Sequence, residues 1–92
     1  MTTDAILAAV CETYEISIHA LRGTGRTRWV IEARMVAIVL LIEMGLSSKQ
    51  CGRILRRDHT SVLYLERKAQ TYAQPMYPER LQRVRDRIRV FV

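Results

Sequence analysis

Five consecutive residues in the second half of the chain carry side chains suited to reading the edge of a DNA base. They are Arg57, Asp58, His59, Thr60 and Ser61. A carboxylate can accept from the amino group of cytosine, an imidazole can donate to N7 of a purine, and threonine offers a methyl group or a hydroxyl. We therefore predict that Asp58, His59, Thr60 and Ser61 contact bases. The alternative is that Asp58 only caps a helix whose exposed first turn follows it.

Two helices joined by a tight turn must position these residues, at about 48–55 and 59–72. Ser47 and Gln50 fit the capping box S-x-x-Q, and Asp58 can cap the second helix. This is the helix-turn-helix pattern, in which the second helix enters the major groove by its N-terminal end. Helical hairpins also occur in proteins that bind no DNA, so the pattern alone leaves the function open.

Helical periodicity extends through the rest of the chain, and strand patterns are almost absent. The expected helices cover about residues 4–14, 18–21, 28–44, 48–55, 59–72 and 79–91. Gly45 is a natural stop for the third helix, and Pro78 suits the start of the last. We therefore predict a single all-α domain over residues 1–92, compact and six-helical, that contains a helix-turn-helix.

The long third helix is apolar on two sides, which predicts either a central position or contact with a partner. The core stripe is expected to contain Val30, Ala33, Ala37, Leu40, Leu41 and Met44. The second stripe contains Met35, Ile38, Val39 and Ile42. This second stripe is either an interface for a homodimer or another protein, or it is covered by the last helix. The last helix is favoured as the cover because its own apolar stripe, which includes Phe91, also needs burial.

The charge distribution favours a polyanionic partner, nucleic acid above all. The formal net charge is +6, and residues 1–20 contain three acidic and no basic residues. Fourteen of the 15 basic residues lie in segments 22–34, 53–68 and 80–89. The arginines of the last segment are most simply a solvated face. Charge alone does not separate a binding surface from a solvated basic surface.

Several classes of protein are not expected from the sequence. Cys11 and Cys51 form no C-x-x-C pair and two histidines are too few for a zinc site, so we expect two free thiols, no metal and no cofactor. The loop at 22–28 lacks the P-loop pattern, and no nucleophile, base and orienting group stand at a workable spacing. We therefore expect no enzymatic activity and no small-molecule substrate.

The chain is also not expected to enter a membrane or be exported. Its longest apolar run, 36–42, has seven residues, whereas a membrane span needs about 20. Residues 1–5 lack the basic region of a signal peptide. The expected location is the cytoplasm, in association with the nucleoid.

The segment Arg57–Leu63 resembles the R-D-H-T-[TS]-V signature of the DNA-binding domain at the C-terminus (domain IV) of DnaA, the bacterial replication initiator. Other matching pieces are an opening apolar helix at 6–21, a basic loop at 26–28 followed by Arg34, and an S-x-x-x-x-G helix at 47–52. The resemblance covers about residues 6–73. It implies a Trp-repressor-like or DnaA domain IV-like fold and specific binding of double-stranded DNA at sites similar to a DnaA box.

The resemblance also implies roles for individual residues. Arg26 matches a loop arginine that enters the minor groove, where a narrow A·T-rich tract has enhanced negative potential. Arg34 and Lys68 match phosphate contacts, and 58–61 match the base-reading residues. Together with the basic and polar side chains around the helix-turn-helix, the expected phosphate contacts are Arg28, Arg34, Lys49, Arg56, Arg57, Tyr64, Arg67 and Lys68.

Departures from the family pattern shape the expected function. The nucleotide-hydrolysing module of DnaA is absent from this sequence, so we expect a regulator of transcription or replication without ATPase activity. Leu55-Arg56-Arg57 stands where the family commonly has a Gly-Gly pair, a change that can tilt the recognition helix. Met35 and Ile42 replace polar or basic residues, and Ser48-Lys49 replaces an apolar-Pro pair. The alternative function is therefore a protein-interaction module that uses the second stripe and binds DNA weakly or nonspecifically.

Overall fold

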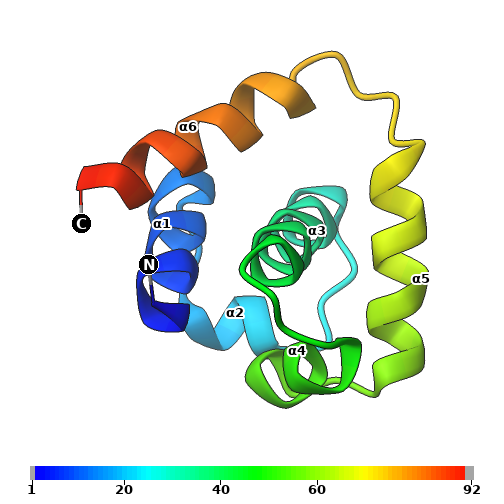
Figure 1. Ribbon diagram of the computed structural model, residues 1–92. Helices are drawn as coiled ribbons and strands as arrows, with labels where there is room; N and C mark the ends of the chain where they lie inside the picture. The colour runs from blue at the N-terminus through cyan, green and yellow to red at the C-terminus, as the bar shows by residue number, and fades with distance from the viewer. Residues whose placement is uncertain (1, 91–92) are drawn as a thin grey trace.

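The computed structural model describes residues 2–90 of the 92-residue chain, and helices are its only regular elements over that range. In chain order they are α1 (Thr3–Tyr14), α2 (Ile18–Arg22), α3 (Arg28–Glu43), α4 (Ser48–Leu55), α5 (His59–Gln70) and α6 (Tyr77–Val90) (Figure 1). The predicted all-α, six-helix architecture is confirmed. The last helix begins two residues earlier than predicted, and Phe91, expected in its apolar stripe, lies outside the described residues.

Short polar side chains set the starts of the first four helices. Thr2, Ser17, Thr27 and Ser47 each accept a hydrogen bond from the backbone N–H three residues later, which satisfies a donor that the helix itself leaves free. The predicted capping box is present, because the Ser47 N–H also donates to Oε1 of Gln50 at 2.8 Å. These starts therefore follow from local sequence.

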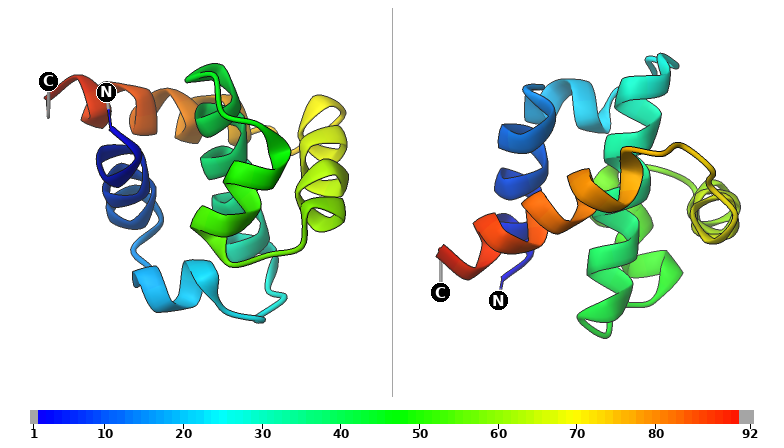
Figure 2. Two further views of the ribbon diagram at one scale, coloured as in Figure 1. Left: turned by 60° about the horizontal axis from the view of Figure 1, so that its bottom comes forward. Right: turned by 90° about the horizontal axis from the view of Figure 1, so that it is seen from above.

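The long helix α3 lies at the centre of the molecule (Figure 1). It packs against α1 and α2 on one side and α5 on the other, and α4 lies below it in Figure 1. Seen from above, α6 passes over α3 from the side of α1 (Figure 2). Every residue of α3 from Glu32 to Ile38 is buried, so both of its apolar stripes face other parts of the chain.

This central position corrects the predicted protein interface. Met35 and Ile38 are 0% exposed and belong to the core, so they cannot contact a partner. Val39 and Ile42 are half-buried and lie beside Ala69 of α5 and Leu81 of α6. The second stripe is thus covered by two helices rather than by the last one alone. The prediction that Met44 belongs to the core is also wrong; it caps the C-terminus of α3, beyond the last turn, and is exposed.

A buried polar cluster fastens α6 to the core. The Tyr14 hydroxyl and the Arg80 Nε both donate to Oε2 of Glu32, each at 2.5 Å, and a second Arg80 nitrogen donates to Oε1 at 2.7 Å. Burial alone raises the pKa of Glu32, but the hydrogen bonds from Arg80 and Tyr14 bring it below its ordinary value. Glu32 is therefore held as a carboxylate that joins α1, α3 and α6.

Two further arginines of α6 are also paired. Arg85 binds Glu43 of α3 through two bonds of 2.7 Å, and Arg87 binds Glu12 of α1 at 3.1 Å. Together with Arg80, these contacts correct the prediction that the arginines of this helix form a simple solvated face. They orient α6 on the acidic residues of α1 and α3.

Candidate nucleic-acid interface

The N-terminal end of α5 projects from the surface, as predicted. Asp58, His59, Thr60 and Ser61 are all exposed. Asp58 has the extended backbone of an N-cap, yet its side chain makes no capping hydrogen bond. Its carboxylate instead accepts from the Thr60 hydroxyl at 2.9 Å and lies 3.2 Å from Nδ1 of His59. The predicted side-chain cap is therefore wrong, because the Thr60 hydroxyl competes successfully for the same carboxylate.

These contacts organise the tip of the helix. The hydrogen bond from Thr60 is the main reason that the pKa of Asp58 lies below its ordinary value. An ionised carboxylate has about four acceptor positions, so Asp58 can still accept from a base. The contact with Asp58 also favours a proton on Nδ1 of His59, which leaves Nε2 directed away from Asp58.

A close contact between α4 and the following turn fixes where this tip lies. The Arg57 N–H donates to the Gly52 carbonyl at 2.7 Å. A Cβ atom added to Gly52 would stand 2.5 Å from the Arg57 carbonyl oxygen, so only glycine fits without movement. Arg56 takes up the left-handed conformation needed at the end of α4, with φ 56° and ψ 49°. The arginine thus adopts a backbone geometry that glycine adopts more easily.

The basic loop, which spans residues 23–27 between α2 and α3 and includes Arg26, is held by Arg34 of α3. This side chain is only 3% exposed. Its guanidinium donates to the carbonyls of Leu21 at 2.9 Å, Gly23 at 2.7 Å and Gly25 at 2.5 Å, with a further bond to Ala20. The predicted role of Arg34 as a phosphate contact is therefore corrected, since most of its donors are already used within the chain.

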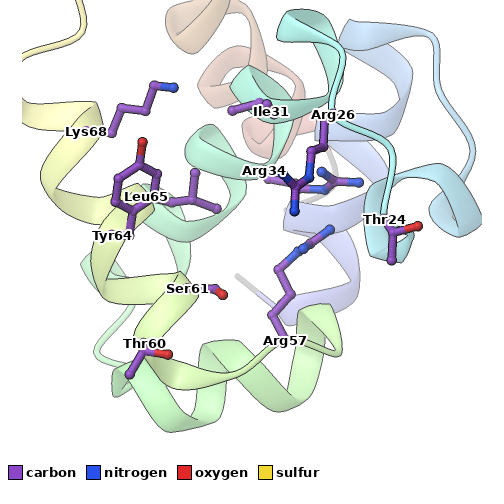
Figure 3. Close-up of a pocket in the computed structure, with 10 residues that line it drawn as sticks. All are labelled: Thr24, Arg26, Ile31, Arg34, Arg57, Thr60, Ser61, Tyr64, Leu65 and Lys68. Carbon is purple, nitrogen blue, oxygen red and sulfur yellow. The ribbon is translucent and has the colours of Figure 1, made fainter.

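An open groove of about 540 Å³ separates the basic loop from α5 (Figure 3). Four cationic and four hydroxyl-bearing side chains line it, and none of the described lining residues is acidic. The lining residues are Thr24, Arg26, Ile31, Arg34, Arg57, Thr60, Ser61, Tyr64, Leu65 and Lys68. In Figure 3 the guanidinium of Arg57 points toward those of Arg26 and Arg34, while the other wall is formed by α5. The loop and α5 therefore face one shared groove.

The electrostatics of the groove favour an anion. Burial, with a contribution from the nearby Arg57, lowers the pKa of Arg34, and burial lowers that of Arg57. Arginine nevertheless stays protonated in proteins, so two neighbouring guanidinium groups remain charged with no carboxylate beside them in the groove. The Nε of Arg57 is buried and has no hydrogen-bond partner among the described residues. A phosphate oxygen would provide the missing negative charge.

The other predicted phosphate contacts lie around the groove rather than in it. Arg28 lines a neighbouring hollow together with Lys68. Lys49, Arg56 and Arg67 are exposed but do not line the groove. Residues that sequence reasoning missed as parts of the groove wall are Thr24, Ile31 and Leu65. Since two of these are apolar side chains and the third a loop threonine, nothing in their type distinguishes them from ordinary packing residues.

In the described part of the chain, no three His, Cys, Asp or Glu side chains come together in a way that could hold a metal ion. Cys11 and Cys51 are free thiols whose pKa values are raised by burial. None of the described helices combines the length and apolar character needed to cross a bilayer.

A comparison with known families agrees with this geometry. The family model described as the bacterial DnaA protein helix-turn-helix matches residues 3–69 of the chain. The matched segment runs from the start of α1 almost to the end of α5. It therefore includes the basic loop, the helix-turn-helix and every residue that lines the groove between them.

Proposed function

Because the chain belongs to the family of bacterial DnaA helix-turn-helix domains, which indicates DNA binding, we propose that it binds duplex DNA in a sequence-specific manner. The observation that carries the proposal is the shared groove, with the exposed end of α5 on one wall and the basic loop on the other. A duplex lying along this groove can be contacted in two neighbouring places by one small domain.

In this arrangement α5 enters the major groove by its N-terminal end, where Asp58, His59, Thr60 and Ser61 reach base edges. Arg26 reaches into the adjoining minor groove, in which a narrow A·T tract attracts arginine. Lys68 lies with its ammonium 5.9 Å from the ring centre of the exposed Tyr64, so that both can approach the phosphate backbone together.

The biological role that fits this domain is occupation of DnaA-box-like sites as a regulator of transcription or replication. In this role the chain acts by binding and not by catalysis, because its side chains present hydrogen-bond donors, acceptors and charge to the duplex. A domain bound at such a site would block access of other proteins to the same duplex.

Selection of duplexes from a random-sequence pool tests the proposal directly. We expect enrichment of one sequence resembling a DnaA box, and tighter binding to the enriched duplex than to a scrambled version at the same salt concentration. His59→Ala should relax discrimination at one base pair by ~1–3 kcal/mol. Because the His59 side chain is 46% exposed, this variant should melt at the wild-type temperature.

His19→Ala is a matched control, since His19 is an exposed histidine of α2. It should leave affinity and sequence preference unchanged. If no sequence is enriched and the scrambled duplex binds equally well, the domain binds DNA without sequence preference. If the His59 variant keeps full discrimination, the role assigned to that side chain is wrong.

A further inference from the structure

We propose that Arg57 is a positioning residue that couples the basic loop to the recognition helix, so that the minor-groove contact of Arg26 depends on it. Arg57 directly precedes the base-reading residues and donates from Nη2 to the Gly23 carbonyl, at the start of the loop. The same carbonyl accepts from Arg34 at 2.7 Å. One oxygen atom thus links α3, the loop and the turn before α5. The inference rests on the proposed function for its effect on DNA binding.

The loop has few other restraints. No backbone–backbone hydrogen bond in the described chain is donated by the amides of residues 24–26. A Cβ added at Gly25 would meet no atom within 4 Å, which shows that the loop is open on that side. Fixing the backbone of one residue costs about 1–2 kcal/mol in conformational entropy, so a loop without its own hydrogen bonds needs external tethers. Arg34 and Arg57 supply them through the carbonyls.

The two tethers, Arg34 and Arg57, differ in their burial and in the number of hydrogen bonds they make. Arg34 is buried and binds four carbonyls on both sides of the loop start, so it forms part of the fold. Arg57 is half-buried, makes one bond to the loop, and has a buried Nε without a partner. Arg57 is therefore the tether that connects the groove with the loop, because an anion that enters the groove meets a guanidinium already in contact with the loop.

The tether links recognition of the minor groove to recognition of the major groove. The position of Arg26 is set by a side chain from the same turn that carries Asp58, so the major-groove and minor-groove contacts form as one unit. Without Arg57 the loop loses one of its two tethers, and Arg26 must be ordered at the moment of binding. The contribution of Arg26 to affinity then falls because part of it is offset by that ordering.

The first test needs no DNA. Arg57→Gln should lower the backbone order parameters of residues 24–26 from values typical of a rigid backbone, about 0.85, toward about 0.6. Arg83→Gln on α6 removes the same charge from an exposed position outside the groove and should leave them unchanged. Unchanged order parameters in Arg57→Gln would overturn the tether. Should Arg57→Gln fail to fold, Arg57→Met, which keeps the aliphatic part of the side chain but has no hydrogen-bond donor, is expected to show the same loss of order.

The second test is a double-mutant cycle with the selected duplex. Arg26→Ala should weaken binding about tenfold in the wild-type background, and only two- to threefold when Arg57 is glutamine. Replacing flanking A·T pairs by G·C adds an amino group to the minor groove, whereas inosine·C pairs do not. The wild type should discriminate between these two duplexes and Arg57→Gln should not. Equal effects of Arg26→Ala in both backgrounds would refute the coupling. A failed duplex selection would refute the proposed function while leaving the loop measurement decisive.

Discussion

The contact between Gly52 and the Arg57 carbonyl can be tested by adding one methyl group. In Gly52→Ala the new Cβ would lie 2.5 Å from the Arg57 oxygen and 3.6 Å from the His59 nitrogen. Both neighbours are backbone atoms, so no side chain can rotate away. The turn must therefore move by at least about half an ångström before the separation reaches 3.0 Å, and the N-terminal end of α5 moves with it.

Two effects of opposite sign decide the outcome. Alanine inside a helix is more favourable than glycine by about 1 kcal/mol. Overpacking a tight site costs about 1–3 kcal/mol, and displacing the turn weakens the hydrogen bond from Arg57 to Gly52, which is worth about 1 kcal/mol. We expect the unfavourable effects to exceed the favourable one, with a net destabilisation of about 1–3 kcal/mol. In a domain of this size that lowers the melting temperature by roughly 5–15 °C.

Urea and thermal unfolding, followed by circular dichroism, measure this change, and binding to the selected duplex measures the displacement of the tip. Gly25→Ala is the control, since no atom lies within 4 Å of its Cβ position; it should change stability by less than about 0.5 kcal/mol. A Gly52→Ala variant as stable as the wild type, or more stable, would show that helix propensity dominates and that the turn accepts a methyl group.

Three further predictions concern single side chains. Glu32→Gln removes the buried partner of Arg80 and should cost about 3 kcal/mol at pH 7. The folded-state pKa of Glu32 lies below its ordinary value of 4.5, so its stabilising effect is complete above pH 4.5 and is lost as the pH falls through the folded value. The free energy of unfolding in urea should therefore change less between pH 7 and pH 3 for the variant than for the wild type. Equal pH dependence of the two proteins would contradict this. Arg56→Gly places glycine at a left-handed position and should raise the free energy of unfolding by about 0.5–1 kcal/mol, whereas a less stable variant would indicate that the arginine side chain stabilises the turn. Lys68→Ala should weaken all duplexes equally and reduce the slope of log K against log salt by about 1; a changed preference at one base pair would make Lys68 a base contact instead.

Most helix boundaries could be predicted because their signals are local. Ser47 and Gln50 are three residues apart, and both bonds of the capping box form within one helical turn. The cap of α5 is the exception. Asp58 has the right type and position for a cap, but the Thr60 hydroxyl two residues later competes for its carboxylate. Local competition between side chains is not resolved by the pattern of residue types.

The role of Arg34 could not be predicted from its neighbours in sequence. Its carbonyl partners lie nine to 14 residues away and come within reach only after α2 and α3 pack together. The surroundings of the second stripe of α3 likewise depend on tertiary packing. Periodicity indicates that Met35 and Ile38 lie on an apolar face, but it does not say whether that face meets solvent, a partner or another part of the same chain.

The pairing of α6 with α1 and α3 has a consequence for how the domain meets a polyelectrolyte. Residues 1–20 and 77–92 together contain five acidic and five basic residues, so the whole surplus of +6 belongs to residues 21–76. Since α1 and the C-terminal part of α6 lie on the opposite side of α3 from α5 (Figure 1), the molecule has a neutral pole and a positive pole. Such an electric dipole turns the domain during diffusion, so that it reaches a duplex with its binding side leading. Reversing the charge of exposed residues at the neutral pole would then alter the association rate more than the lifetime of the complex.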